Sequence, residues 1–308
     1  MKNVLITGCS GFLSSHLIEK LSEDYKIFGF TEIKDFKTDK FDYEIIDIRD
    51  ESSVDNYVKK VKPDLTFHFA AITNVGFSWK NKKLTYEVNI IGSSNLFEAL
   101  SKYSPKSKVI IMSSAEIYGD KGNDPISVNE GIDVRNPYSL SKYSMEMIAD
   151  LYINQELLDI IKVRSFNFTG PGQDEKFVSS DFAKQIALIE KGLREPVIRV
   201  GNLEARRDFS DVRDIVNYLI KISNIGKSGE IYNLCSGNAY SIRYILDILL
   251  SYSERKIKVV VDKSKVRPVD IPVLLGNYQE LKEKLKIEKK YRIEQTVLDL
   301  LNYWRNKV

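Results

Sequence analysis

Cysteine and histidine are scarce in this chain, and their scarcity argues against several kinds of protein. Two cysteines among 308 residues, Cys9 and Cys235, have no spacing that makes a disulfide framework or a zinc site, so both are interpreted as reduced structural residues. The two histidines, His16 and His68, lie near no plausible triad or ligand cluster. Hydrolase and metal chemistry are therefore poorly supported, and no metal is expected.

Long apolar runs and a one-sided charge are also missing. No stretch approaches the roughly 18 consecutive apolar residues that a membrane span needs. The start, Met-Lys-Asn-Val-Leu-Ile-Thr-Gly, enters a strand at once, without the charged and apolar regions of a signal peptide. Lys and Arg number 46 against 43 Asp and Glu, dispersed along the chain, for a formal net charge of +3. We expect a cytoplasmic protein that binds neither membrane nor nucleic acid.

The first half of the sequence alternates short β-branched runs with longer amphipathic segments. This pattern is typical of βαβ units, and it predicts an α/β fold with a Rossmann-type doubly wound parallel sheet over residues 1–165. The predicted strands are residues 4–7, 26–30, 43–46, 65–69, 108–112 and 160–164. The predicted helices between them are residues 11–21, 52–60, 85–102 and 138–154.

The second half begins with a change of texture at a Gly/Pro-marked loop, Thr169-Gly-Pro-Gly172. We expect a smaller mixed α/β substrate domain over residues 166–308, parts of which pack back on the first sheet. Its predicted elements are helices at 181–191 and 211–222, strands at 230–234 and 257–261, a helix capped by Ser241, and helices from Asn277 and Glu294.

A glycine-containing loop follows the first predicted strand, in Thr7-Gly-Cys-Ser-Gly-Phe12. Bare backbone between a strand and a helix lets N–H groups approach a pyrophosphate at the helix N-terminus, so the loop predicts dinucleotide binding. The third glycine of the usual pattern permits close packing of helix on sheet, and here its place is taken by Ser14, a small residue.

The residues after the second and third strands bear on the adenine end of such a cofactor. An acid at the second strand's end grips the ribose hydroxyls of NAD, whereas a base accepts the extra phosphate of NADP. The chain offers both, since Glu32 favours NAD and Lys34 would accommodate NADP. Asp47 and Ile48, after the third strand, are placed for the adenine edge, although Asp47 is equally well interpreted as a helix-start acid.

Small residues close the fourth predicted strand in His68-Phe-Ala-Ala71. Ala70 and Ala71 would let the backbone approach the middle of the cofactor. His68 itself is interpreted as a packed structural histidine.

Tyr138 and Lys142 are the strongest candidates for catalytic residues. Residues four apart share a helix face, so the ammonium is expected to stabilise tyrosinate and to lower the pKa of Tyr138 below its usual value of about 10. Ser114 ends the fifth strand, at the edge where open α/β sheets bind ligands, and its hydroxyl can hold a substrate carbonyl. The alternative interpretation of Ser114 is a strand-end cap. Glu116, two residues further on, is a carboxylate near the same edge that is available for proton transfer or for a sugar hydroxyl, although a purely structural role is equally plausible.

Two arginines of the second half, Arg207 and Arg267, are candidates for substrate binding. A guanidinium fork matches phosphate oxygens in two-point geometry. A solvated surface charge is the usual interpretation of an isolated arginine, but two in this region fit a diphosphate-linked substrate.

Together these motifs resemble the extended short-chain dehydrogenase/reductase family of nucleotide-sugar enzymes, over nearly the whole chain. The resemblance implies a catalytic set of Ser114, Tyr138 and Lys142 with Glu116. It implies NAD(P)H as cofactor, with NAD versus NADP not resolved, bound by Gly8, Ser10, Gly11, Phe12, Leu13, Asp47, Ile48, Ala70, Ala71, Asn89, Tyr138 and Lys142. It implies substrate contacts from Asn167, Val178, Arg207 and Arg267.

Within that family, the segment Ser114-Ala-Glu-Ile-Tyr-Gly119 resembles the branch that handles GDP-6-deoxyhexoses. A reductase and a 4,6-dehydratase of that branch share Glu116, so this residue does not separate them; the segments Gly170-Pro-Gly-Gln173 and Asp208-Phe-Ser-Asp211 favour the reductase. An epimerase is a more distant possibility. A dinucleotide-sensing regulator would lack the Tyr/Lys pair. The resemblance also implies a homodimer that pairs through the helices predicted at 85–102 and 138–154.

Overall fold

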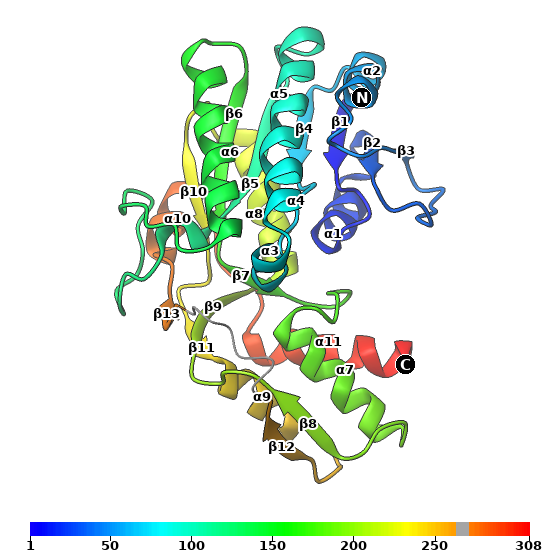
Figure 1. Cartoon of the computed structure of the whole chain (residues 1–308), viewed down its shortest axis with the longest axis vertical. Helices are drawn as coiled ribbons and strands as arrows, with labels where there is room; N and C mark the ends of the chain where they lie inside the picture. The colour runs from blue at the N-terminus through cyan, green and yellow to red at the C-terminus, as the bar shows by residue number, and fades with distance from the viewer. Residues whose placement is uncertain (263–270) are drawn as a thin grey trace. The chain divides into compact units, whose positions relative to one another are not determined.

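The computed structural model describes residues 1–262 and 271–308, and its elements are drawn in Figure 1. The chain divides into two compact units. Two segments lie across the boundary expected at residue 165, because 118–131 belongs to the second unit and 216–232 to the first. The first unit consists of Met1–Ile117, Ile132–Ser165 and Val216–Tyr232, and the second of Tyr118–Gly131, Phe166–Ile215 and Asn233–Val308.

A seven-stranded sheet forms the centre of the first unit, in the order β10-β6-β5-β4-β1-β2-β3. The neighbouring strands from β3 across to β6 are all parallel. This is the doubly wound order, which reverses between β1 and β4, so the predicted Rossmann-type sheet is confirmed. The strands are β1 (Lys2–Thr7), β2 (Tyr25–Thr31), β3 (Asp42–Ile45), β4 (Leu65–His68), β5 (Lys108–Ser114), β6 (Asp159–Ser165) and β10 (Ile231–Leu234).

Apolar packing on the sheet explains why these segments form strands. Val4, Leu5 and Ile6 of β1 are fully buried, as expected for a parallel strand covered on both faces. One face is covered by α2, α5 and α6, whose apolar residues share one core, and α5 and α6 lie side by side (Figure 1). The helices and turns are α1 (Phe12–Leu21), α2 (Glu51–Val61), α3 (Val75–Lys80), α4 (Lys82–Tyr86), η1 (Glu87–Ile91), α5 (Gly92–Tyr103), η2 (Ala115–Tyr118), α6 (Pro137–Asn154) and α8 (Val212–Ile225).

The prediction of a single helix over residues 85–102 is wrong in one respect. A π-helical segment, η1, separates α4 from α5. It contains Asn89, whose side chain bonds the backbone of Ile72. The apolar spacing of the sequence continues through this segment, so periodicity does not reveal the wider turn.

The second unit has its own sheets and core. One sheet has the order β11-β9-β13, with β7 also paired to β9, and β12 pairs with β8. Helices α7 and α11 lie against each other (Figure 1), and their apolar residues join those of α9 in a common core. The elements are β7 (Asn167–Thr169), α7 (Val178–Glu190), β8 (Val197–Val200), β9 (Arg206–Asp211), β11 (Ala239–Ser241), α9 (Ile242–Ser251), β12 (Lys258–Val261), β13 (Val273–Leu274), α10 (Tyr278–Leu285) and α11 (Ile293–Lys307). Among the described helices, none combines the length and apolar character that a membrane crossing requires.

Candidate active site

The glycine loop joins β1 to α1 at the carboxyl end of the sheet. Gly8 has φ of +68°, and a Cβ added there would lie 2.9 Å from the backbone nitrogen of Ala70. Gly11 is the N-cap of α1 and donates its N–H to the Gly8 carbonyl at 3.0 Å. Phe12 and Leu13 open the helix. Bare backbone therefore lies both against the end of β4 and at a helix N-terminus, an arrangement that fits a phosphate group.

Two serines fix this loop through contacts that the sequence pattern does not predict. The Ser14 hydroxyl donates to the Gly8 carbonyl at 2.8 Å, so the residue that replaces the third glycine ties the helix back to the loop. The Ser10 hydroxyl lies 2.7 Å from that of Thr31, at the end of β2. Ser14 is thus part of the construction of the loop as well as a small residue that packs.

Asp47 and Ile48 follow β3 and have different surroundings. Arg49 binds both carboxylate oxygens of Asp47, with Nε 3.0 Å from each, and holds the pKa of that carboxyl below its usual range. The N-cap of α2 is Asp50, which accepts from the Ser53 N–H, so Asp47 is not the capping acid. Ile48 is buried in the core.

His68 is bonded on both ring nitrogens. Its Nδ1 lies 2.8 Å from the Thr7 hydroxyl, and its Nε2 lies 2.8 Å from the Ser93 hydroxyl. The Thr7 hydroxyl also accepts the N–H of Ala70 at 3.0 Å. Burial lowers the pKa of His68 to about 3, so the ring is neutral. This network holds the end of β1 against the end of β4.

Asn89 connects the segment after Ala71 to helix α6. Its Oδ1 accepts the Ile72 N–H at 2.8 Å, and its Nδ2 donates to the Ile72 carbonyl at 2.9 Å and to the Ser141 hydroxyl at 2.9 Å. The Ser141 hydroxyl donates to the Tyr138 carbonyl at 2.7 Å. Asn89 therefore fixes the backbone on which Tyr138 is carried.

Ser114, Tyr138 and Lys142 come together within the first unit. Tyr138 and Lys142 lie in the first turns of α6 and are only 8% and 3% exposed. Ser114, the last residue of β5, forms a hydrogen bond that lowers the pKa of Tyr138. The Lys142 Nζ donates to the Met112 carbonyl at 2.7 Å, so helix and strand are joined beside the phenol.

The expected effect of Lys142 on Tyr138 is wrong for this structure. Burial raises the pKa of Tyr138 to about 12, against the lowering effect of the Ser114 hydrogen bond and with a further increase from Glu116. Burial lowers the pKa of Lys142 to about 8. Removal from water disfavours the charged form of both groups, and the ammonium is bonded to the Met112 carbonyl. The phenol is therefore fully protonated at neutral pH.

Glu116 lies in the same cluster as Tyr138. It follows Ser114 in η2, and its N–H donates to the Ser114 hydroxyl at 3.2 Å. Its Oε2 accepts from the Nδ2 of Asn136, the N-cap residue of α6, at 3.1 Å. Glu116 is half-buried and is oriented by Asn136, the residue that begins the helix of Tyr138, so a role of its carboxylate in the reaction stays a prediction.

The residues expected to bind substrate belong to the second unit. Arg207, on β9, is buried, and its Nη1 donates to the Ile271 carbonyl at 2.6 Å. Asn167, on β7, and Val178, the first residue of α7, are exposed. Arg267 lies outside the described residues.

Asp208 is a buried acid that was not predicted as a site residue. Its carboxylate accepts the Ser236 N–H at 2.7 Å, the Ser236 hydroxyl at 2.7 Å, the Gly237 N–H at 2.9 Å and the Gly276 N–H at 3.2 Å. It joins β9 to two loops of the second unit. The sequence draws attention to the segment that begins at Asp208, but no local pattern shows that this carboxylate is buried.

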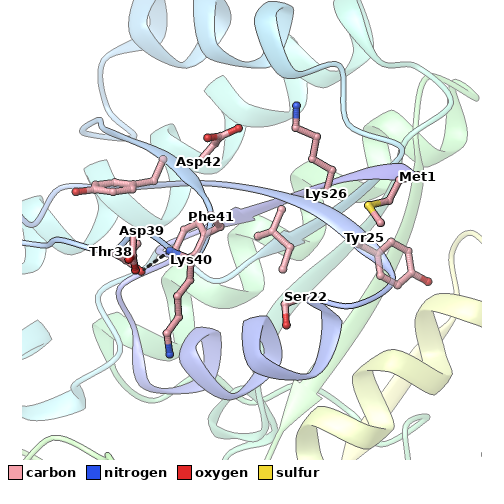
Figure 2. A pocket seen from close by; sticks show the side chains of 11 residues that line it. Met1, Ser22, Tyr25, Lys26, Thr38, Asp39, Lys40, Phe41 and Asp42 are labelled. Atoms are coloured by element: carbon pink, nitrogen blue, oxygen red, sulfur yellow. Dashed lines mark hydrogen bonds between the residues drawn. The ribbon is translucent and has the colours of Figure 1, made fainter.

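A hollow of about 610 Å³ lies elsewhere in the first unit. Figure 2 shows its lining, which includes Ser22, Tyr25, Lys26, Thr38 and Lys40. Tyr25 begins β2, whereas the glycine loop follows the carboxyl end of β1, so the hollow lies at the opposite edge of the sheet. It is therefore separate from the candidate site. Within residues 1–262 and 271–308, no group of three or more His, Cys, Asp or Glu is arranged to hold a metal.

A parallel sheet of this order, with a glycine loop after β1 and a Ser, Tyr and Lys set at β5 and α6, defines a dinucleotide-dependent oxidoreductase of the short-chain dehydrogenase/reductase class. The family model described as GDP-mannose 4,6 dehydratase matches residues 5–300, and the chain belongs to this family. It is an NAD(P)-dependent nucleotide-sugar oxidoreductase of the extended type.

Individual relatives cover nearly all of the chain. GDP-6-deoxy-D-mannose reductase of Pseudomonas aeruginosa is 26% identical over 309 residues, which span 100% of this chain and 98% of that protein. GDP-6-deoxy-D-talose 4-dehydrogenase of Aggregatibacter actinomycetemcomitans is 30% identical over 300 residues, which span 96% and 95%. The solved structure of RMD from Pseudomonas aeruginosa complexed with NADPH has a TM-score of 0.88 at 26% identity and covers all of both chains.

Proposed function

We propose that this protein uses NAD(P)H to reduce the C4 keto group of GDP-4-dehydro-6-deoxy-D-mannose, also called GDP-6-deoxy-D-lyxo-4-hexulose, to give GDP-D-rhamnose. The observation that carries the proposal is the cluster of Ser114, Tyr138 and Lys142 at the end of β5 and the start of α6. The likeness to the Pseudomonas reductase supports the same assignment.

The chemistry assigns a separate task to each residue. When bound, the reduced nicotinamide supplies the hydride that goes to C4. Tyr138 gives its phenolic proton to the C4 oxygen, and the Ser114 hydroxyl holds that oxygen in place. Because the pKa of Tyr138 is raised to about 12, the phenol is available as a proton donor at every physiological pH. A positioned general acid contributes roughly 10²- to 10⁴-fold to the rate.

The residues proposed to hold the cofactor surround the glycine loop and the ends of β3 and β4. The bare backbone at Gly8 and Gly11 fits a pyrophosphate, since a side chain at position 8 would meet the backbone of Ala70. Asn89 would act by fixing the backbone after Ala71. The proposed contacts are Gly8, Ser10, Gly11, Phe12, Leu13, Asp47, Ile48, Ala70, Ala71, Tyr138 and Lys142.

The second unit is proposed to hold the GDP portion. The bond from Arg207 to the Ile271 carbonyl fixes its guanidinium, which is a fork suited to a diphosphate. Asn167, Val178 and Arg267 complete the proposed set.

A second product is favoured by the relative named GDP-6-deoxy-D-talose 4-dehydrogenase. The 6-deoxy-D-talose and 6-deoxy-D-mannose configurations differ at C4, so the face from which hydride reaches C4 decides the product. A 4,6-dehydratase or an epimerase is a further candidate activity, because Glu116, Tyr138 and Lys142 would serve each of these reactions.

One experiment separates these activities. The purified protein is given GDP-4-dehydro-6-deoxy-D-mannose with NADH or NADPH, and in a second tube GDP-mannose without reductant. Stoichiometric oxidation of one nicotinamide in the first tube supports the reductase, and NMR of the product gives the C4 configuration. Formation of the keto sugar in the second tube would identify a dehydratase. The faster nicotinamide also gives the cofactor preference, with NADH expected if Glu32 dominates and NADPH if Lys34 does.

The glycine loop gives a sharp prediction about cofactor binding. Gly8→Ala is expected to weaken NAD(P)H binding at least about tenfold, because the new methyl group meets the Ala70 backbone 2.9 Å away and must displace the loop. Fluorescence titration of the reduced cofactor measures the affinity. Gly122→Ala is the matched control, since Gly122 has a similar φ of +73° but nothing within 4 Å of the added atom. If Gly8→Ala and the parent bound NAD(P)H with equal affinity, the glycine loop would not be part of the cofactor site.

We also propose a homodimer that pairs through α6 and the adjoining η1. Met147 and Leu151 on α6 are 55% and 59% exposed, and Ile91 on η1 is 54% exposed. Apolar side chains gathered on neighbouring elements indicate a protein interface. Sedimentation is expected to give twice the mass of one chain for the parent, and one chain's mass for the Met147→Lys/Leu151→Lys variant. The control is Ile225→Lys, an equally apolar exposed site on α8.

A further inference from the structure

Helix α6 carries a row of functional groups on the side that faces the sheet. Tyr138, Lys142, Glu146 and Asp150 follow one another at intervals of four, which places them on one helix face. The first two belong to the candidate site. Glu146 binds Arg164 of β6, and Asp150 binds Lys162 of the same strand. Two ion pairs between α6 and β6 therefore lie next to the candidate site, further along the same face of the helix.

The pair of Glu146 and Arg164 is the buried one. The Arg164 Nε lies 3.1 Å from Oε1 and 3.2 Å from Oε2, and Nη2 lies 2.7 Å from Oε2. The two side chains are 2% and 6% exposed, whereas Asp150 is 43% exposed. Arg164 is in register with Ser113, the neighbour of Ser114. A buried ion pair is by itself weak evidence for a stabilising role, since well-packed apolar residues of similar volume are often as stable.

Glu146 acts on Lys142, which lies one turn away. Burial lowers the pKa of Lys142, and the charge of Glu146 raises it. Other charged groups near α6 have partners of their own. Glu98 of α5 accepts from the Tyr152 hydroxyl, Glu116 of η2 accepts from Asn136, and Lys162 of β6 pairs with Asp150. Tyr138 and His68 are neutral at pH 7, and Arg164 is itself a cation bound to Glu146. Glu87 of η1 pairs with Arg49 and with Lys83 of α4.

We propose that Glu146 is a positioning residue that keeps Lys142 in its ammonium form, and that Arg164 holds Glu146 in place for this purpose. For its effect on turnover, the proposal rests on the proposed function. When Tyr138 gives its proton to the C4 oxygen, its O–H bond breaks, an O–H bond forms on the sugar, and a phenolate remains. In the resting site the ammonium is bonded to the Met112 carbonyl and does not lower the pKa of Tyr138. In the proposed step its positive charge, one helical turn away, offsets the phenolate that forms, until solvent returns a proton to Tyr138.

The direct test is the titration of Lys142 in lysine labelled with ¹³C at Cε, followed by NMR and assigned with Lys142→Met. The parent is expected to titrate near pH 8. Glu146→Gln is expected to lower this value by about one to two pH units, as Coulomb's law gives for a charge roughly 6 Å away at an effective dielectric of about 20. Asp150→Asn is the matched control, because it removes the next carboxylate along the same face, and its titration should match the parent's.

A second variant guards against a folding defect in Glu146→Gln. The double variant Glu146→Leu/Arg164→Met removes both charges and keeps apolar volume in the core. It is expected to stay folded by circular dichroism and to shift the Lys142 titration in the same direction as Glu146→Gln, but by less, because it also removes the Arg164 cation that repels the ammonium. A Lys142 titration unchanged in whichever of these two variants folds would overturn the proposal.

Turnover provides the second readout. Activity that needs the ammonium is present below the pKa of Lys142 and is lost as the pH rises through it. The alkaline limb of kcat should therefore move to lower pH in Glu146→Gln and stay in place in Asp150→Asn, with KM little changed in both. If the parent protein does not reduce the keto sugar, the proposed function is wrong. The proposal for Glu146 is then still tested by the NMR titration of Lys142, which does not depend on turnover.

Discussion

Phenylalanine at position 138 is expected to lower kcat for reduction of the keto sugar about 100- to 10,000-fold. Tyr138 lies against Ser114 with its pKa raised to about 12, so it is protonated and oriented before the reaction begins. Phenylalanine keeps the ring and removes the hydroxyl group, and with it the proton that the C4 oxygen takes up and the hydrogen bond with Ser114. Nicotinamide oxidation at saturating substrate measures kcat, and fluorescence titration is expected to show NAD(P)H affinity within a few-fold of the parent's.

Tyr143→Phe is the control for this substitution. Tyr143 lies one residue after Lys142 on the same helix and is half-buried, so both variants remove one hydroxyl from α6. Its turnover should match the parent's. If Tyr138→Phe turned over as fast as Tyr143→Phe, the proton would have to come from another group, and Glu116 would be the first candidate to examine.

Arg164→Met is expected to lower the free energy of unfolding by about 3–5 kcal/mol, because it leaves the Glu146 carboxylate buried without its partner. The double variant Glu146→Leu/Arg164→Met is expected to lie close to the parent, since it leaves no charge behind. Urea unfolding at pH 7 measures both. The loss in Arg164→Met should shrink as the pH falls, because an unpaired buried carboxyl has a raised pKa and takes up a proton in the folded state.

Lys162→Met is the control for this prediction. It breaks the neighbouring ion pair of β6 and α6, but the Asp150 it leaves behind is 43% exposed and stays hydrated. The expected loss is about 0–1 kcal/mol. Equal losses in Lys162→Met and Arg164→Met would show that burial of Glu146 does not matter to stability.

The strands of the large sheet were predictable because each is encoded by a short continuous run of residues. A parallel strand buried on both faces needs a run of β-branched and apolar residues, and β1, β2 and β4–β6 lie within about two residues of such runs. The short strands β7, β9, β11 and β13 were not predicted. Each owes its conformation to pairing with a segment distant in sequence, which no local pattern records.

The sequence predicted which residues lie together in the candidate site, but it did not predict the direction in which their pKa values change. The spacing of Tyr138 and Lys142 is a property of one helix, so sequence alone places them together. Whether the ammonium faces the phenol or the Met112 carbonyl depends on how α6 packs on β5, and the expected pKa change was wrong for that reason. The partnership of Glu146 with Arg164 was missed because burial of a charge is decided by a partner on another element.

The edge strand β10 has a consequence for how the protein is made. It is the last strand of the large sheet in chain order, yet it pairs with β6, which precedes it by more than sixty residues. During translation, the edge of β6 that pairs with β10 stays exposed until residue 234 has emerged from the ribosome. Nascent chains stalled before that point should depend on holdase chaperones, whereas longer ones should resist protease.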